Sequence, residues 1–151
     1  MKFMKRIIVV SLIAVFALPA LAQIREIPKI VEETFANQYP NAEHVEFKDF
    51  VVKVLVEFEW KGDRMMATYT NKGLWKGSEK EWSFEKLPTE VKDGFEKSKF
   101  GDGAWEVEET AMLLLPGGSE QYRIEVRKSD VQKKYLFFNT TGRLLRTSVT
   151  L

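Results

Sequence analysis

The segment IPKIVEETF, residues 27–35, has the pattern of a helix start, and LPTEVKDGF at residues 87–95 repeats it. At an offset of 60 residues the proline, the valine and the phenylalanine coincide: Pro28 with Pro88, Val31 with Val91, and Phe35 with Phe95. Proline suits the first helical turn, where its missing N–H would have no partner. Apolar residues spaced four apart form one buried stripe. Two short amphipathic helices are therefore predicted.

The likeness between the two halves continues in their later segments. VEFEWKGD (56–63) resembles IEVRKSD (124–130), and YTNKGLW (69–75) resembles FNTTGRL (138–144). Matches of spacing and residue type in three separate segments indicate a duplicated unit. We expect two tandem modules, residues 23–84 and 85–151, that fold as one compact unit, because about 60 residues bury too little surface to be stable alone.

The rest of each half has the period-two pattern of antiparallel strands. In VVKVLVEFEW (51–60) the apolar face carries Val52, Val54, Val56, Phe58 and Trp60, and the polar face carries Lys53, Glu57 and Glu59. Turns are predicted at KGD (61–63), NKG (71–73), KSD (128–130) and NTTG (139–142). The sequence therefore predicts an α+β fold in which each module is one helix followed by about four antiparallel strands.

The first 22 residues have the pattern of a secretory signal peptide. A basic start, MKFMKR, precedes the apolar run IIVVSLIAVFAL, and small residues follow at Ala20 and Ala22. We expect cleavage after Ala22 and a periplasmic or secreted product with no stable membrane insertion. The alternative is a retained membrane anchor, but a spanning helix needs about 20 apolar residues, and this run has twelve.

Composition excludes several classes of protein. The 151 residues are 44% apolar and 13% aromatic, which argues against a disordered chain. The 23 basic and 22 acidic residues are spread along the sequence, so no basic field predicts nucleic-acid binding. There is no cysteine, which excludes disulfides and a cysteine nucleophile. An exported chain without disulfides depends on its core alone, which suits a bacterial periplasm.

Several motifs resemble the PepSY-like family of secreted bacterial proteins, which are similar in fold to the beta-lactamase inhibitory protein. They are the Ile/Leu-Pro helix starts with an aromatic residue four positions after the valine, YPNAEHVEFKD (39–49), NKGLW (71–75) and NTTGRLL (139–145). The resemblance covers residues 24–151 and implies one curved antiparallel sheet with both helices on its convex face. It carries over no inhibitory residue, because no motif here maps onto one.

The chain offers little catalytic or metal-binding chemistry. His44 is the single histidine, and without cysteine it cannot supply the usual zinc ligands. GDG (101–103) is too short for a calcium loop. Acidic clusters occur at Glu79 and Glu81, and at Glu106, Glu108 and Glu109. A glycosidase needs two carboxylates at a defined separation across a cleft, which these clusters do not indicate. We predict no enzyme, no metal and no cofactor.

The sheet face without helices is the predicted binding surface. Its strand positions carry charges of both signs, and aromatic residues flanked by charges are typical interface anchors. The candidate binding residues are Lys53, Glu57, Trp75, Trp82, Arg123 and Arg127. Trp82 has a second interpretation, as a plug between the two modules.

The favoured function is a non-catalytic periplasmic binding module that acts by protein–protein interaction or inhibition through this open face. The expected partner is an envelope or secreted protein. The alternative is a protein that binds a small ligand or an envelope polymer. A deep apolar pocket with convergent polar groups would favour the alternative, and a bare sheet face with exposed aromatic residues would favour a protein partner.

Overall fold

A computed structural model describes residues 25–149, so the predicted signal peptide lies outside the described residues. The elements are α1 (Lys29–Gln38), β1 (Glu43–Phe50), β2 (Lys53–Trp60), β3 (Asp63–Thr70), β4 (Trp75–Trp82), the 3-10 helix η1 (Phe84–Lys86), α2 (Thr89–Glu96), β5 (Glu106–Leu114), β6 (Glu120–Ser129), β7 (Gln132–Asn139) and β8 (Leu144–Val149). Neither helix in this part of the chain is long and apolar enough to cross a membrane.

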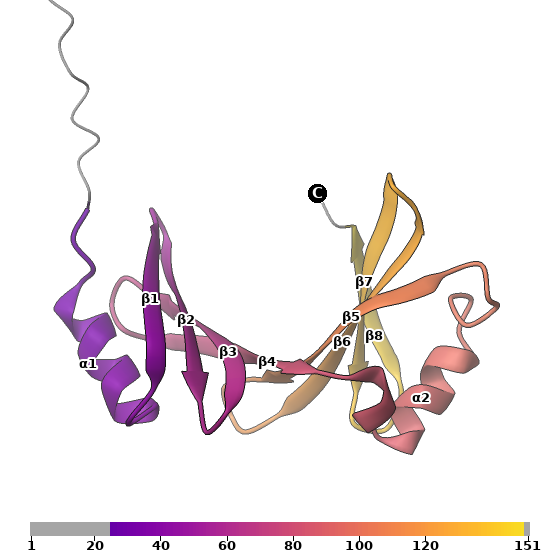
Figure 1. The fold of residues 1–151 in the computed structure, drawn as a ribbon, viewed down its shortest axis with the longest axis horizontal. Coiled ribbons are helices and arrows are strands. Elements are labelled where there is room, and N and C mark those ends of the chain that lie inside the picture. Colours follow the sequence, from indigo (N-terminus) through magenta and orange to yellow (C-terminus); the bar gives the residue numbers. More distant parts are fainter. Residues whose placement is uncertain (1–24, 150–151) are drawn as a thin grey trace, which may run out of the picture.

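The eight strands form one antiparallel sheet in the order β1 to β8, so every strand pairs with its neighbours in the sequence (Figure 1). β4 and β5 pair from Ser78 opposite Leu114 to Trp82 opposite Thr110. The sheet is strongly curved, with α1 near its β1 end and α2 near its β8 end (Figure 1). The strands of the two ends stand apart, and β4, β5 and β6 connect them.

The predicted description of the fold as two tandem helix-plus-four-strand modules is wrong. The structure is mainly one continuous eight-stranded antiparallel sheet, and its two helices contribute only ten and eight residues. The β4–β5 pairing joins the strands on either side of the predicted boundary. The similarity between the two halves of the sequence indicates where strands occur. Which strands pair is set by backbone hydrogen bonds and burial, and the offset between similar segments contains no information on these. The α+β class fits, and the limits 23–84 and 85–151 stay a prediction.

Two buried clusters lie beneath the helices. The first contains Val31, Phe35, Tyr39, Val54, Val56, Phe58, Met65, Ala67 and Tyr69. The second contains Leu87, Val91, Phe95, Phe100, Tyr122, Ile124, Val126, Leu136 and Phe138. The stripes predicted on the two helices are thus buried, and each fully buried apolar side chain stabilises the fold by about 2 kcal/mol.

Both clusters use the same face of the sheet. On β4, Ser78 contacts Tyr39 of the first cluster, and Trp82 packs against the second cluster. Residues an even number of positions apart on a strand point to the same side, so the two clusters lie on one side of β4. Within residues 25–149 no helix lies on the opposite face of the sheet, which is called the open face below.

One predicted face assignment is wrong. Val52 is predicted on the buried face of a strand, but it is 78% exposed. β1 ends at Phe50 and β2 begins at Lys53, so Val51 and Val52 form the turn between them. The alternation of apolar residues continues into this turn, and periodicity alone does not mark where a strand begins.

The turn between β7 and β8 fixes α2 against the sheet. A Cβ atom on Gly142 would overlap the carbonyl oxygen of Glu90, and one on Gly94 would overlap the carbonyl oxygen of Gly142. The turn between β3 and β4 meets α1 in a similar way, since a Cβ on Gly73 would lie 2.8 Å from Cγ1 of Ile30. Backbone segments approach this closely only where no side chain intervenes.

We expect Gly142→Ala to destabilise the protein more than Gly62→Ala. Both glycines have a left-handed backbone, with φ of 80° and 82°, so alanine costs about 1 kcal/mol in backbone conformation at each. Only at Gly142 does the new methyl group also meet the backbone of α2, which adds about 1–3 kcal/mol of overpacking. Urea unfolding measures both free energies, and equal losses would contradict the close contact.

Candidate functional site

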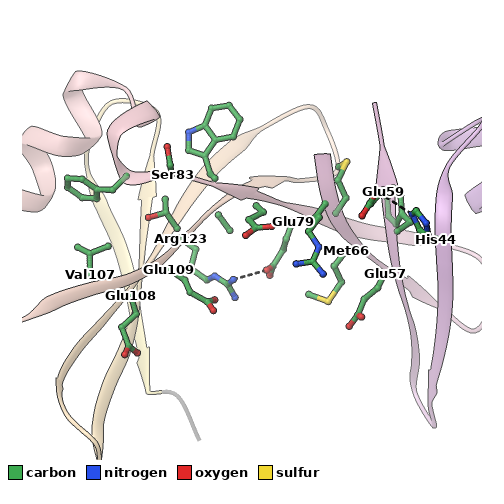
Figure 2. A pocket seen from close by; sticks show the side chains of 18 of the residues that line it. His44, Glu57, Glu59, Met66, Glu79, Ser83, Val107, Glu108, Glu109 and Arg123 are labelled. Atoms are coloured by element: carbon green, nitrogen blue, oxygen red, sulfur yellow. Dashed lines mark hydrogen bonds and ion pairs between the residues drawn. The ribbon is translucent and has the colours of Figure 1, made fainter. Parts of the chain in front are cut away.

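The open face of the sheet contains a groove with a volume of about 930 Å³ (Figure 2). Residues of β1, β2 and β3 form one wall, residues of η1 and β5 form the other, and β4 and Arg123 lie between them. Figure 2 shows Glu57 and Glu108 on opposite sides of this groove. Trp82, Ser83 and Phe84 lie at its margin, but the rings of Trp82 and Phe84 pack against the second cluster on the helix side of the sheet.

The groove carries a surplus of negative charge. Its lining includes the carboxylates of Glu46, Glu57, Glu59, Glu79, Glu81, Glu85, Glu108 and Glu109. The basic residues that line it are Arg64, Arg123 and His44. Because the sheet buries its other face, the polar positions of neighbouring strands all project into the same space. The groove is therefore an acidic surface built from several strands.

A half-buried ion pair lies at the centre of the groove. Nη2 of Arg123 is 3.1 Å from Oε2 of Glu79, and the Arg123 guanidinium lies 4.6 Å from the centre of the Tyr135 ring. Figure 2 shows this pair bridging β4 and β6. A guanidinium that is both paired and stacked keeps little rotational freedom. The centre of the face is therefore held in one arrangement before any partner binds.

The outer parts of the groove carry more exposed ion pairs. Nζ of Lys48 is 2.8 Å from Glu57, and Nζ of Lys133 and Nε of Arg127 are each 2.7 Å from Glu108. The hydrogen bond from Lys133 and then the charge of Arg127 lower the pKa of Glu108, which keeps that carboxylate ionised. Exposed pairs of this kind contribute little to the stability of the fold. A partner's charged side chains can therefore replace one member of such a pair with little loss of free energy.

Two central carboxylates take no part in these ion pairs. Glu81 at the end of β4 and Glu109 on β5 are both exposed, and the pairs in the groove involve other side chains. They are the charges that a partner reaches without breaking an existing interaction.

Glu125 is a buried carboxyl group at the edge of this charged surface. It is 8% exposed, and it lies opposite Glu109 on β5 and opposite Tyr135 on β7. Burial, followed by the charge of Glu109, raises the pKa of Glu125, although Lys133 and Arg123 oppose the shift. Glu125 therefore holds its proton more tightly in the folded protein than in the unfolded chain.

The structure brings three of the six predicted binding residues into the groove. Glu57, Trp82 and Arg123 line it. Arg127 pairs with Glu108 at its edge, and Lys53 lies at the β1–β2 turn, with Nζ 5.7 Å from the centre of the Phe50 ring. Their roles in binding stay a prediction.

Trp75 is not brought to the groove. It is half-buried against the first cluster, and its Nε1 donates a hydrogen bond to Oγ of Ser78 at 2.9 Å. Ser78 is also 2.6 Å from the hydroxyl of Tyr39. The ring is thus held on the helix side of the sheet by a small polar network.

Sequence reasoning noted the acidic residues of β4 and of β5 but treated them as separate clusters. Glu79 and Glu81 join Glu108 and Glu109 in one groove because β4 pairs with β5. The signal that was available is the position of each glutamate on the polar face of its strand. His44 also lines the groove, with Nδ1 3.3 Å from Glu59. Across residues 25–149 no group of three acidic or histidine side chains is arranged to hold a metal.

Solved structures share this arrangement of strands and helices. A BLIP-like protein from Bacteroides fragilis superposes with a TM-score of 0.74 at 21% identity, over 85% of this chain and 89% of that chain. The fold is BLIP-like. A DUF2874 family protein from Bacteroides ovatus gives a TM-score of 0.74 at 24% identity, over 83% of this chain and 89% of its own.

A third similar structure is a proposed periplasmic protein from Bacteroides eggerthii, with a TM-score of 0.72 at 21% identity over 83% and 90% of the two chains. No protein-family model matches the chain, and no curated protein matches it. Likeness at these identities shows the fold alone. The expected fold resemblance is confirmed, and membership of the PepSY-like family stays a prediction.

Ser78→Ala should destabilise the protein by about 2 kcal/mol, because it leaves the Tyr39 hydroxyl and the Trp75 N–H without their partner. Ser119→Ala is the control, since Ser119 is exposed in a turn and should change the free energy of unfolding by less than about 0.5 kcal/mol. Chemical denaturation followed by tryptophan fluorescence measures both. Equal, small effects would show that the network contributes nothing.

Glu125→Gln should raise thermal stability at neutral pH. The pKa of Glu125 is higher in the folded protein than in the unfolded chain, so the stability that this group contributes is present at low pH and is lost as pH rises through the folded pKa. Glutamine does not ionise, and its advantage should therefore grow from below pH 4.5, the ordinary carboxyl value, towards neutrality. Melting curves across pH test this, with Glu96→Gln on exposed α2 surface as control. An advantage independent of pH would contradict it.

Proposed function

We propose that the chain is a non-catalytic binding protein of the cell envelope whose concave sheet face receives a protein partner. The observation that carries this proposal is the acidic groove on the open face, which no helix of the described part of the chain covers. An extended charged surface formed by several strands suits a protein partner, because one small molecule would touch only part of it.

The charge of the groove defines the surface that the partner should present. Eight glutamates against two arginines and one histidine favour a partner with lysine and arginine side chains at its contact site. Complementary charge accelerates encounter and fixes orientation more than it adds affinity. Glu81 and Glu109 are the two carboxylates best placed to meet such cations, because they are exposed and central.

The predicted site residues take distinct roles in this proposal. Arg123, fixed by Glu79 and Tyr135, orients the centre of the face. Glu57 and Arg127 belong to exposed pairs at the two sides, which a partner's charges can replace. Trp82 lies at the margin of the groove with its ring packed against the second cluster, so we propose that it supports this edge of the face from the helix side.

One observation favours the second candidate, an envelope-polymer binder. Glu81, Ser83 and Glu85 line the groove close together in the sequence, at its η1 side. Their carboxylate and hydroxyl oxygens can accept hydrogen bonds from the hydroxyl groups of a polysaccharide. A protein partner accounts for more of the groove, since charged side chains line it on β1, β2, β4 and β5 as well.

The envelope location rests on two supports. The first 22 residues have the pattern of a signal peptide, with cleavage proposed after Ala22. The fold is shared with a proposed periplasmic protein. We also propose that the chain belongs with the PepSY-like proteins, on the motifs described above, and that inhibition of an envelope or secreted protein is one form its binding takes.

Charge reversal in the groove tests the proposal. Immobilised wild-type protein should retain a specific partner from envelope extract, and Glu81→Lys/Glu109→Lys should lose it, with an affinity reduced about tenfold or more. The matched control is Glu33→Lys/Glu96→Lys, which changes net charge equally at exposed positions of α1 and α2. Titration of the purified partner gives the dissociation constants.

Retention of the partner by the groove variant would contradict a site on the concave face. Loss of the partner from both double variants would show that net charge alone, and not the groove, is recognised. Retention of a polysaccharide with no protein would favour the second candidate.

A further inference from the structure

Exposed apolar side chains gather at the end of the sheet formed by β1. Val51 is 81% exposed, Val52 78% and Leu74 62%. Ile30 on α1 and Phe50 at the end of β1 are about half exposed. We call these five residues the apolar end.

Direct contacts join the segments that carry the apolar end. Nδ2 of Asn71, in the β3–β4 turn, donates to the carbonyl oxygen of Val51 at 2.8 Å. Gly73 in the same turn lies against Ile30 of α1. The β1–β2 turn, the β3–β4 turn and the start of α1 therefore form one connected surface, although they are distant in sequence.

Four cations surround this surface. Arg25 donates from Nη1 to the carbonyl oxygen of Val51 and pairs through Nε with Asp49. The Nζ of Lys53 lies over the Phe50 ring. Lys29 and Lys72 are exposed next to Ile30 and Gly73 in the sequence. Apolar tips flanked by basic side chains match the interface of a bilayer that contains anionic lipids.

Before the proposed cleavage of the signal peptide, the course of the chain brings this same end towards a membrane. Residues 7–18 are an apolar run, and Arg25, where the described structure begins, contacts the β1–β2 turn. Figure 1 shows the start of the described chain beside the tip formed by β1 and β2. Until cleavage after Ala22, a membrane that holds the apolar run is therefore separated from Arg25 by residues 19–24 alone.

We propose that the apolar end is a peripheral membrane-binding surface that docks reversibly on anionic phospholipid. Val51 and Val52 enter the headgroup region, and Arg25, Lys53 and Lys72 contact lipid phosphates. The acidic groove lies on the concave face and is not part of this surface. The bound protein therefore keeps its groove available beside the membrane.

The β6–β7 turn provides a matched comparison within the same chain. Val131 is 89% exposed, and it follows Asp130, whose side chain is 98% exposed. A carboxylate at that tip opposes contact with anionic lipid. Val131→Asp therefore makes the same chemical change as Val51→Asp at a turn to which we assign no membrane contact.

Vesicle co-sedimentation tests the proposal with the chain from Gln23 onward, which keeps both buried clusters and lacks the apolar run. Wild type should bind vesicles of phosphatidylglycerol and phosphatidylcholine, and it should bind phosphatidylcholine alone much more weakly. Val51→Asp/Val52→Asp should lower the partition coefficient about tenfold or more. Lys53→Gln and Lys72→Gln should each lower it about fivefold, and Val131→Asp should bind as wild type does.

Three results would overturn the proposal: no binding of wild type to the mixed vesicles, unchanged binding of Val51→Asp/Val52→Asp, or an equal loss in Val131→Asp. All of these substitutions are at exposed positions, and melting temperatures matched to wild type confirm that the variants are folded. Partner capture by the groove is measured separately, so failure here leaves the proposed function untouched.

Discussion

The pairing of β4 with β5 is the contact on which the rest of the structure depends. Five residue pairs, from Ser78 and Leu114 to Trp82 and Thr110, join two groups of strands whose buried clusters are otherwise separate. Ala111 and Leu113 project to the open face along this line and are almost fully buried. Without this pairing there would be two small sheets and no groove between Glu57 and Glu108.

The two faces of the sheet differ in composition and role. The helix-covered face holds most of the buried apolar side chains, so a chain without cysteine is stabilised by packing and hydrogen bonds and not by disulfides. The open face holds charges, and these fall into two sets. Arg123 is fixed by Glu79 and Tyr135, whereas the pairs at the sides, such as Lys48 with Glu57, are exposed. Because the side chains at the centre are already fixed, a partner that binds there orders few further side chains, and the loss of conformational entropy on binding is small.

Much of the secondary structure could be predicted because it depends on local pattern. The stripe of Val91 and Phe95 marked α2, and the alternation around Val54 and Val56 marked β2. One curved sheet was expected from the family resemblance, whereas the repeat spacing indicated two modules and did not show the pairing of strands across η1 and α2 that makes the sheet continuous. The same pairing assembles the groove, so Glu81 and Glu109 were noted as acidic but not as members of one site. Trp75, flanked by a turn and charges, packs inward because Ser78 accepts its N–H.

The order of the strands has a consequence for how the chain folds. Each strand pairs with the next one along the chain, and turns of two residues connect β1 to β2 and β2 to β3. Short loops close at small entropic cost, and local contacts favour fast folding. The longest closure joins β4 to β5 across residues 83–105. A chain that emerges N-terminus first can therefore form its first four strands early, and the slowest step should be the docking of the remaining strands onto β4.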